Sequence, residues 1–229
     1  LATVLRDERA PLKTWCEASL LYMKAGKREK EGCDLLNAAV DSDDVMSGSN
    51  TTDRLRVLAS AGIASLAQAN RHITDGSSEV PGGLNLLDNL LESSKAAEKR
   101  DADQQEELRA LADTRFTKAD NINQVNPMTW IGRGMLNLAQ NRLDQAKFFF
   151  ENLTLRECGE ILPALIGMAA VKYMEKDYDG ALELYGRAMK KYPKQSGAPV
   201  RVGFGMACYR LGQIDRAKAA FRRAHDSDP

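Results

Sequence analysis

Residues 176–193 read KDYDGALELYGRAMKKYP, and three positions within them set a spacing that recurs along the chain. Ala181 is followed four positions later by an aromatic residue, Tyr185, and three positions after that by a small residue, Ala188. Equivalent sets occur on either side, Ala146/Phe150/Leu153 and Ala217/Phe221/Ala224, so the first position recurs after 35 and 36 residues. A pattern repeated at a fixed period predicts a repeat array, in which each unit buries its apolar face against its neighbours.

The period is close to the ~34 residues of the tetratricopeptide-repeat (TPR) unit, a pair of antiparallel helices. In that template, small residues near positions 8, 20 and 27 let the two helices approach closely, and large residues fill the gaps between them. We therefore expect an all-α fold, a right-handed superhelical TPR solenoid of antiparallel helix pairs. Arrays of this kind bind partners and seldom catalyse reactions.

The repeat pattern also predicts how the chain is divided. An apolar stripe within residues 52–72 predicts a buried helix, and its expected partner is the helix that carries Ala112, Phe116 and Ala119. In chain order we expect a degenerate TPR-like unit (1–45), a TPR-like helix pair with a Gly/Ser-rich insertion at about 74–102 (46–126), and three regular TPR units (127–161, 162–197 and 198–229).

Composition narrows the function classes. The chain has 32 Lys and Arg against 32 Asp and Glu, and this zero net charge argues against binding nucleic acid with the whole surface. No apolar run reaches the ~18 residues of a membrane span. The chain has four well-separated cysteines, Cys16, Cys33, Cys158 and Cys208. We expect them to be reduced thiols packed on helices, as is typical of an intracellular protein. The termini, Leu1 and Pro229, suggest a piece of a longer protein.

No motif indicates catalysis. His72 and His225, the two histidines, fall on predicted helices, where surface or capping roles are expected. No nucleophile elbow and no phosphate-binding loop is present in the sequence. We therefore expect no enzymatic activity, no cofactor and no bound metal.

The first helix of each TPR unit lines the concave surface, chiefly through positions 2, 5, 9, 12 and 13. These positions predict an apolar, methionine-rich groove for an apolar or amphipathic segment of a partner, and position 13 of the last unit adds Arg210. The candidate partner-binding residues are Met128, Ile131, Met135, Leu138, Ile166, Ala170, Tyr173, Met174, Val202, Met206 and Tyr209. The alternative is that positions 9 and 12 are half buried between units, which would place about half of the set in the core.

Two further patterns bear on partners. TPR co-chaperones hold a carboxylate tail with Lys, Asn and Arg at positions that here are Ile131, Met135, Gly167, Pro199 and Gly203, so a chaperone-tail clamp is not expected. Between positions 187 and 223 the chain has ten Lys or Arg and one acid. An acidic partner or a nucleic-acid backbone could dock there, although we favour a solvated convex face. The candidate basic docking face is Lys190, Lys191, Lys194, Arg216, Lys218, Arg222 and Arg223.

Several runs of residues go beyond the TPR pattern. They are PALIGMA (163–169), KDYDGALELY (176–185), VRVGFG (200–205) and RAKAAFRRA (216–224), together with the early segment 12–27. They resemble the N-terminal TPRs of the large scaffold subunit of the RNA polymerase II-associated factor complex, and generic TPRs do not share Val-Arg-x-Gly-x-Gly at that place. The insertion at about 74–102 departs from that family's shorter connection, which suggests a divergent member.

The resemblance implies a nuclear, non-catalytic scaffold that takes part in transcription elongation and the histone modification coupled to it. It also implies that the name-giving subunit of the complex threads an extended segment over these TPRs, with RNA polymerase II as an indirect partner. Two alternatives stay open. One is a TPR adaptor of another complex, in trafficking or the cell cycle, and the other is the regulatory TPR module of an enzyme whose catalytic domain lies outside this chain.

Overall fold

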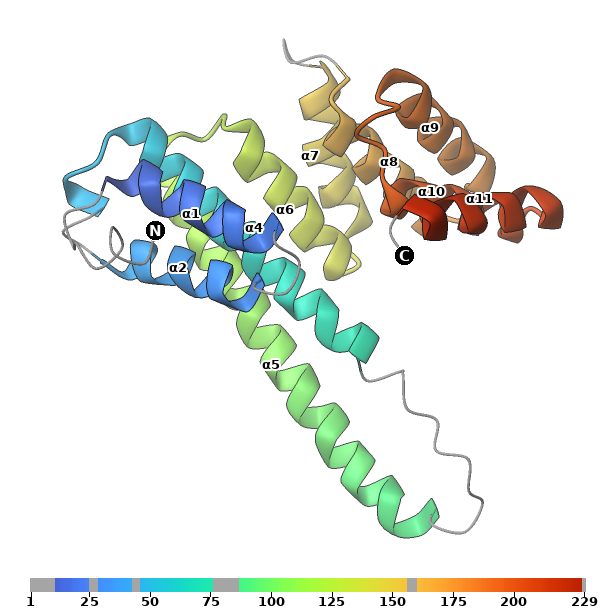
Figure 1. Cartoon of the computed structure of the whole chain (residues 1–229), viewed down its shortest axis with the longest axis horizontal. Helices are drawn as coiled ribbons and strands as arrows, with labels where there is room; N and C mark the ends of the chain where they lie inside the picture. Colours follow the sequence, from blue (N-terminus) through green and yellow to red (C-terminus); the bar gives the residue numbers. More distant parts are fainter. Residues whose placement is uncertain (1–10, 25–28, 43–45, 76–86, 156–159, 228–229) are drawn as a thin grey trace. The chain divides into compact units, whose positions relative to one another are not determined.

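The computed structural model describes residues 11–24, 29–42, 46–75, 87–155 and 160–227. Within these ranges the regular structure is helical, with no strand, as the repeat pattern predicted (Figure 1). The helices are α1 (Leu12–Lys24), α2 (Glu29–Asp41), α4 (Thr51–Asp75), α5 (Leu87–Ile122), α6 (Pro127–Ala139), α7 (Leu143–Leu155), α8 (Leu162–Met174), α9 (Tyr178–Lys191), α10 (Ala198–Arg210) and α11 (Ile214–Ser227). They form two compact units, Leu1–Gly132 and Arg133–Pro229, and α6 crosses the boundary between them.

In the second unit, short turns join the helices into pairs. Each turn has one residue with a positive φ, at Asn141 (57°), Lys176 (65°) and Gly212 (73°), and these positions are again 35 and 36 residues apart. The N-terminus of α9 is capped by Asp177, whose side chain accepts a hydrogen bond from the Gly180 N–H at 3.0 Å. The same turn conformation therefore recurs with the period of the sequence pattern.

The aromatic residue of each repeat lies between two helices that carry small residues. Phe150 of α7 contacts Gly134 of α6 and Gly167 of α8, because a Cβ at either glycine would lie within 2.5 Å of the Phe150 ring. Tyr185 of α9 contacts Gly203 of α10 in the same way, again at 2.5 Å. The Phe150 ring thus packs on the first helix of its own repeat, α6, and on the first helix of the next repeat, α8. Close backbone approach at these glycines makes the stacking possible.

The last aromatic residue of the series differs in burial. Phe150 is 1% exposed, whereas Phe221 of α11 is 39% exposed. Phe221 contacts Gly205 of α10, where a Cβ would lie 2.7 Å from its ring, and α11 is the last helix that the structure describes. The last copy of the spacing in this sequence thus has an aromatic side chain that is partly accessible to solvent.

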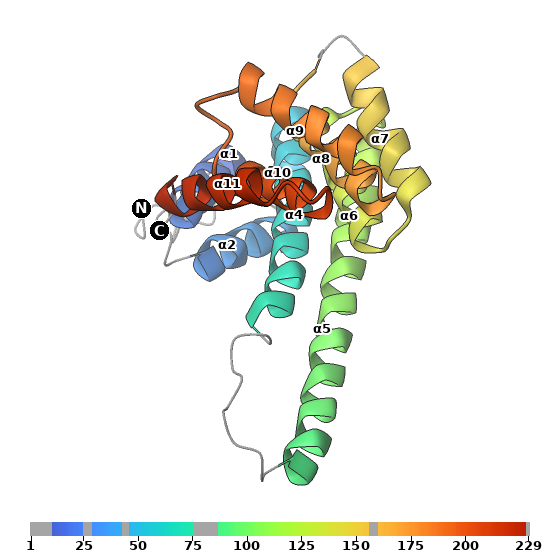
Figure 2. The ribbon, with the colours of Figure 1, turned by 90° about the vertical axis from the view of Figure 1, so that its right-hand side faces the viewer.

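The first unit uses the same packing. The helices α4 and α5 lie side by side (Figures 1 and 2), and Phe116 of α5 is fully buried against Gly62 of α4 and Gly132 of α6. Ala112 and Ala119 are also fully buried, so the expected partner of the 52–72 stripe does pack against it. The helix α1 packs on α2, and both contact α4.

The helix α5 differs from the predicted insertion. Residues 87–102, which the predicted insertion includes, are the first part of one continuous 36-residue helix. The segment 87–122 contains neither Gly nor Pro and has many charged residues with good helix propensity. The Gly/Ser-rich part, residues 76–86, lies outside the described residues, and the repeat boundaries themselves remain predictions.

A buried arginine joins three helices of the first unit. Arg115 of α5 is 3% exposed, and its guanidinium donates hydrogen bonds to the Ala61 carbonyl (3.0 Å), Ser65 Oγ (2.6 Å) and Asn37 Oδ1 (2.8 Å). Desolvation on burial lowers the pKa of Arg115 from its ordinary value. Polar groups in such a site are costly unless hydrogen-bonded, so this network specifies how α2, α4 and α5 meet.

Candidate partner-binding surface

Seven of the predicted groove residues lie on α8 and α10 and define a surface that we call the α8–α10 surface. They are Ile166, Ala170, Tyr173, Met174, Val202, Met206 and Tyr209. None of them is buried, and Met174, Val202, Met206 and Tyr209 are exposed. Met135 and Leu138 of α6, which belong to the same unit, are half-buried. Met128 and Ile131 lie on the part of α6 that belongs to the first unit, where Met128 is exposed and Ile131 half-buried.

Each of these helices has two apolar faces. The packed face of α8 is formed by Ala164, Leu165, Gly167, Ala169 and Val171, and that of α10 by Val200, Gly205, Ala207 and Cys208. The second face of α10 has Val202, Met206 and Tyr209 at the i, i+4, i+7 spacing of a helical stripe. A surface helix with one buried face would normally have polar residues on its other face, whereas α10 has a second apolar stripe in contact with solvent.

At its C-terminal end the α8–α10 surface carries an arginine among tyrosines. Arg210 Nε donates a hydrogen bond to Tyr173 Oη at 3.2 Å. The Tyr173 ring lies edge-on to the ring of Tyr178, with 5.3 Å between centroids. The hydrogen bond to Tyr173 is the main cause of a raised pKa of Arg210, so the guanidinium stays charged. Tyr178 lies outside the TPR groove positions, and the sequence pattern therefore missed it.

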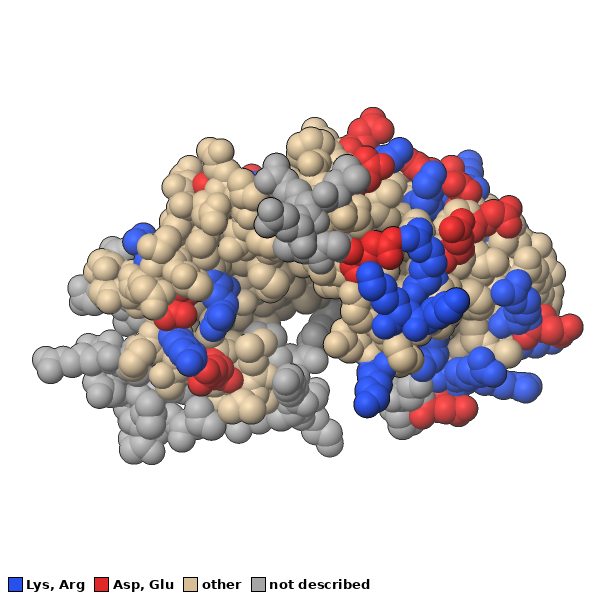
Figure 3. Space-filling model, turned by 90° about the horizontal axis from the view of Figure 1, so that it is seen from above, with Lys and Arg blue, Asp and Glu red and all other residues tan. Residues whose placement is uncertain are grey.

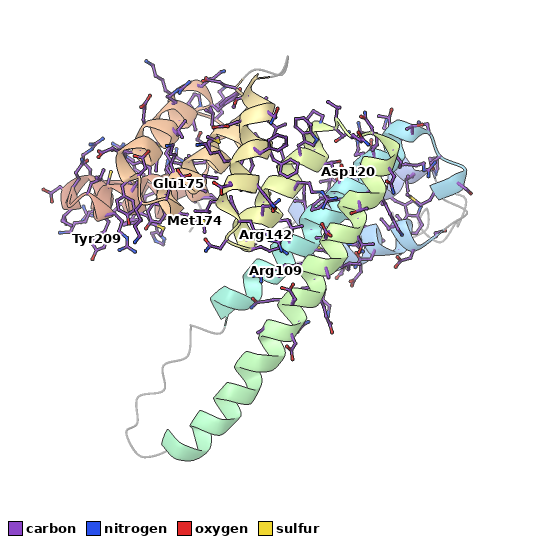
Figure 4. All side chains as sticks on the ribbon, turned by 180° about the vertical axis from the view of Figure 1, so that it is seen from behind. Arg109, Asp120, Arg142, Met174, Glu175 and Tyr209 are labelled. Atoms are coloured by element: carbon purple, nitrogen blue, oxygen red, sulfur yellow. The ribbon has the colours of Figure 1, made fainter. Side chains whose placement is uncertain are left out.

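The turn after α8 has two acids that lie close to a lysine. Lys172 Nζ lies 3.0 Å from Asp177 Oδ2 and 3.7 Å from Glu175 Oε2. The hydrogen bond from Lys172 lowers the pKa of Asp177, and the backbone N–H of Gly180 acts in the same direction. Both carboxylates therefore face a lysine. In Figure 4, Met174 and Tyr209 lie at the C-terminal ends of α8 and α10, with Glu175 directly after α8.

All seven residues of the predicted basic face are exposed. Several cations of this region already have protein partners. Glu160 forms ion pairs with Arg187 and, at 3.5 Å, with Lys191, while the guanidinium of Arg216 lies 5.6 Å from the centre of the Phe204 ring. Lys and Arg lie among Asp and Glu on the face drawn in Figure 3. The basic docking face therefore remains a prediction.

The remaining reactive side chains are shielded or isolated. Cys16, Cys33 and Cys208 are free and buried, and burial raises the pKa of each thiol. Cys158 and the side chain of His72 lie outside the described residues, and His225 is exposed on α11. Within the described ranges, no three His, Cys, Asp or Glu side chains cluster as a metal site would need. No helix in the part of the chain that the structure describes is long and apolar enough to cross a membrane.

The chain is similar in sequence to a repeat family and to several known proteins. Residues 172–229 match the family model described as "Tetratricopeptide repeat". The chain is 29% identical over 227 residues to "Protein CTR9 homolog" of Arabidopsis thaliana, covering 99% of this chain and 18% of that protein. It is 28% identical over 119 residues to "RNA polymerase-associated protein CTR9" of Caenorhabditis elegans, covering 50% and 10%. Over 84 residues it is 37% identical to "Anaphase-promoting complex subunit 3" of Schizosaccharomyces pombe, covering 36% and 12%.

The chain thus spans less than a fifth of the length of each of these relatives. The match to the repeat family covers α9, α10 and α11, which include two of the three copies of the spacing found in the sequence. The described helices pair through short turns and stack through one aromatic residue per repeat. Together these observations show that the chain is an all-α tetratricopeptide-repeat solenoid protein.

Proposed function

We propose that this chain is a non-catalytic scaffold whose α8–α10 surface binds a segment of a partner subunit. In this proposal the scaffold assembles the RNA polymerase II-associated factor complex, in the nucleus, for transcription elongation and the histone modification coupled to it. The partner is the name-giving subunit of that complex, other subunits bind the same scaffold, and RNA polymerase II is reached through them.

The extent of the similarity to the Arabidopsis relative carries the proposal. A match produced only by TPR spacing would be confined to the regular repeats, which begin at about residue 127. The match to the Arabidopsis protein instead covers 99% of this chain, including the irregular helices α1 to α5. The match to the anaphase-promoting complex subunit covers only 36%. Similarity outside the repeat pattern therefore supports a polymerase-associated scaffold over a general TPR adaptor.

The α8–α10 surface supports the binding role. Its exposed methionines and tyrosine form an apolar area that a partner could cover, and methionine side chains adapt to different shapes. Covering such residues would remove apolar area from water at about 25 cal/mol per Å². An extended or helical segment with apolar side chains at helical or alternating spacing fits this chemistry.

Affinity purification from nuclear extract tests the proposal, with the 229-residue chain as bait and mass spectrometry as readout. We expect the wild type to recover polymerase-associated factor subunits and the double variant Ile166→Asp/Met206→Asp to lose them, because two carboxylates would be buried against an apolar segment. The control is Phe148→Asp, which places one carboxylate on an exposed apolar residue of α7, outside the α8–α10 surface. Circular dichroism should show equal helix content in all three proteins.

Equal recovery by the wild type and the double variant would refute the α8–α10 surface as the interface. Recovery of other complexes in place of polymerase-associated subunits would refute the assignment to that complex. The match to the anaphase-promoting complex subunit makes a cell-cycle adaptor the second candidate, and recovery of anaphase-promoting complex subunits would favour it.

A further inference from the structure

We propose that Arg210 and the tyrosines around it anchor a carboxylate of the bound segment, so that the α8–α10 surface selects an apolar segment with an Asp or Glu within it. The tyrosines are Tyr173, Tyr178 and Tyr209. This inference rests on the proposed binding role of the surface and specifies the chemistry of its occupant.

Arg210 is an exposed cation whose protein neighbours are phenols. Its Nε donates a hydrogen bond to Tyr173 Oη at 3.2 Å, and this bond, with the nearby phenols of Tyr178 and Tyr209, raises the pKa of Arg210. Among the residues that the structure describes, no carboxylate lies within ion-pair distance of it. Arg187 of the same unit, by contrast, pairs with Glu160. The guanidinium of Arg210 is therefore charged and has no compensating anion within the described part of the protein.

Two acids that follow Tyr173 in the chain are already engaged. Glu175 and Asp177 both face Lys172, at 3.7 and 3.0 Å, and Asp177 also caps α9 through Gly180. Drawing either carboxylate toward Arg210 would break an existing ion pair, and moving Asp177 would also remove a helix cap. The anion that complements Arg210 should therefore come from the partner.

The surroundings of Arg210 suit an interface anchor. Tyr209 is 61% exposed, the highest value among the exposed large apolar side chains, and Met206 lies one helical turn before Arg210. Tyrosine and arginine are enriched among the residues that contribute most to binding energy. The hydrogen bond through Nε orients the guanidinium and leaves its terminal nitrogens for a carboxylate, which arginine can bind in a bidentate manner. Part of the conformational entropy that the Arg210 side chain would lose on binding is thus already lost in the unbound protein.

The charge also excludes one class of occupant. A wholly apolar segment laid across Met206 and Tyr209 would cover Arg210 and remove its water without supplying an anion, which is unfavourable. A segment with an acid at that point supplies the ion pair and still covers the methionines. Charge complementarity therefore favours an apolar segment with an internal Asp or Glu over a neutral one.

Selection of a phage-displayed library of random peptides on the whole 229-residue chain tests the inference. The peptides should be about 16 residues long, so that each can span the α8–α10 surface. We expect the selected peptides to share an Asp or Glu flanked by apolar residues. Isothermal titration should show that Arg210→Gln and Tyr209→Ala each weaken their binding by about tenfold or more, the order expected for a truncated charge pair or hot-spot tyrosine. Arg210→Lys should recover part of the loss, since it restores the charge without the planar guanidinium.

Two controls give the test its specificity. Arg142→Gln removes an exposed arginine that directly precedes α7, outside the α8–α10 surface, and it should leave peptide affinity unchanged. Changing the peptide acid to its amide should cost as much as Arg210→Gln, with no further loss when both changes are combined. Selected peptides without an acid, equal affinity for Arg210→Gln and the wild type, or a library that yields no binder would each overturn the inference.

The outcomes separate this inference from the proposed function. Acidic peptides that depend on Arg210, together with a failure to recover polymerase-associated subunits, would leave the anchor standing and remove the proposed complex. Recovery of those subunits in equal amount by the wild type and Arg210→Gln would leave the complex standing and remove the anchor.

Discussion

The substitution Gly167→Ala tests how the repeats stack. Gly167 lies in the interior of α8, and a Cβ at this position would lie 2.5 Å from two carbons of the Phe150 ring. The ring cannot move aside freely, because a Cβ at Gly134 on its other side would lie equally close. The overlap must therefore be relieved by shifting α8 relative to α7, and overpacking of this kind costs about 1–3 kcal/mol.

The higher helix propensity of alanine stabilises α8 and so opposes the overlap, and a control substitution measures this effect alone. Gly186 lies inside α9, and a methyl group added there would have nothing within 4 Å, so Gly186→Ala should stabilise by about 0.5–1 kcal/mol through helix propensity alone. Gly167→Ala gains the same amount and loses about 1–3 kcal/mol to overlap, for a net loss of up to about 2.5 kcal/mol.

Thermal unfolding followed by circular dichroism measures both effects. For a chain of this size, 1 kcal/mol shifts the Tm by about 2–4 °C. We expect Gly186→Ala to raise the Tm by a few degrees and Gly167→Ala to lower it. Phe150→Leu should lower the stability of the Gly167→Ala variant by less than it lowers the stability of the wild type, because the smaller side chain leaves room for the methyl group. A Tm raised equally by both alanines would refute the stacking of Phe150 between Gly134 and Gly167.

Three further predictions concern the core. Ala181→Arg should cost more than ~2 kcal/mol, because Ala181 is fully buried and a guanidinium cannot fit between the helices; an unchanged Tm would contradict the repeat register. Arg115→Ala should cost about 2–4 kcal/mol in urea unfolding, since it removes the three hydrogen bonds that Arg115 donates inside the first unit, and a loss below about 1 kcal/mol would count against the network. Burial raises the pKa of Cys208, so its stabilising contribution should be complete below the ordinary thiol pKa and decline as pH rises above it. A Cys208→Ser variant that loses stability with pH as steeply as the wild type would contradict this.

Much of the fold could be predicted because helix geometry imposes its own spacing on the sequence. The four-then-three spacing of Ala181, Tyr185 and Ala188 places these residues on one side of a helix, and all three are buried. The glycines at Gly132, Gly167 and Gly203 recur at the same 35- and 36-residue intervals, but the interval alone does not say what they contact. Their role follows from the structure, which places an aromatic ring of the preceding repeat against each one. The repeat interval of these glycines is nevertheless a signal that could have found them.

The candidate site could be predicted in part for the same reason. None of the eleven residues at the first-helix positions is buried, because buried and exposed faces alternate with the helical period, and their role in binding stays a prediction. Tyr178 was missed because it comes from the second helix of its pair and reaches the surface through its contact with Tyr173. Whether the exposed residues bind a partner is a question for the experiments above.

The sequence by itself determined the class of fold, the period of the repeat and the side of each helix that is buried, since all three follow from spacing along one chain segment. Only the tertiary structure decided which residues of different helices meet. Arg115 hydrogen-bonds to Ala61, 54 positions earlier, and Arg210 to Tyr173, 37 positions earlier. Such pairs depend on how far one helix slides and turns against another, and close packing of side chains, which no local spacing encodes, sets that relation.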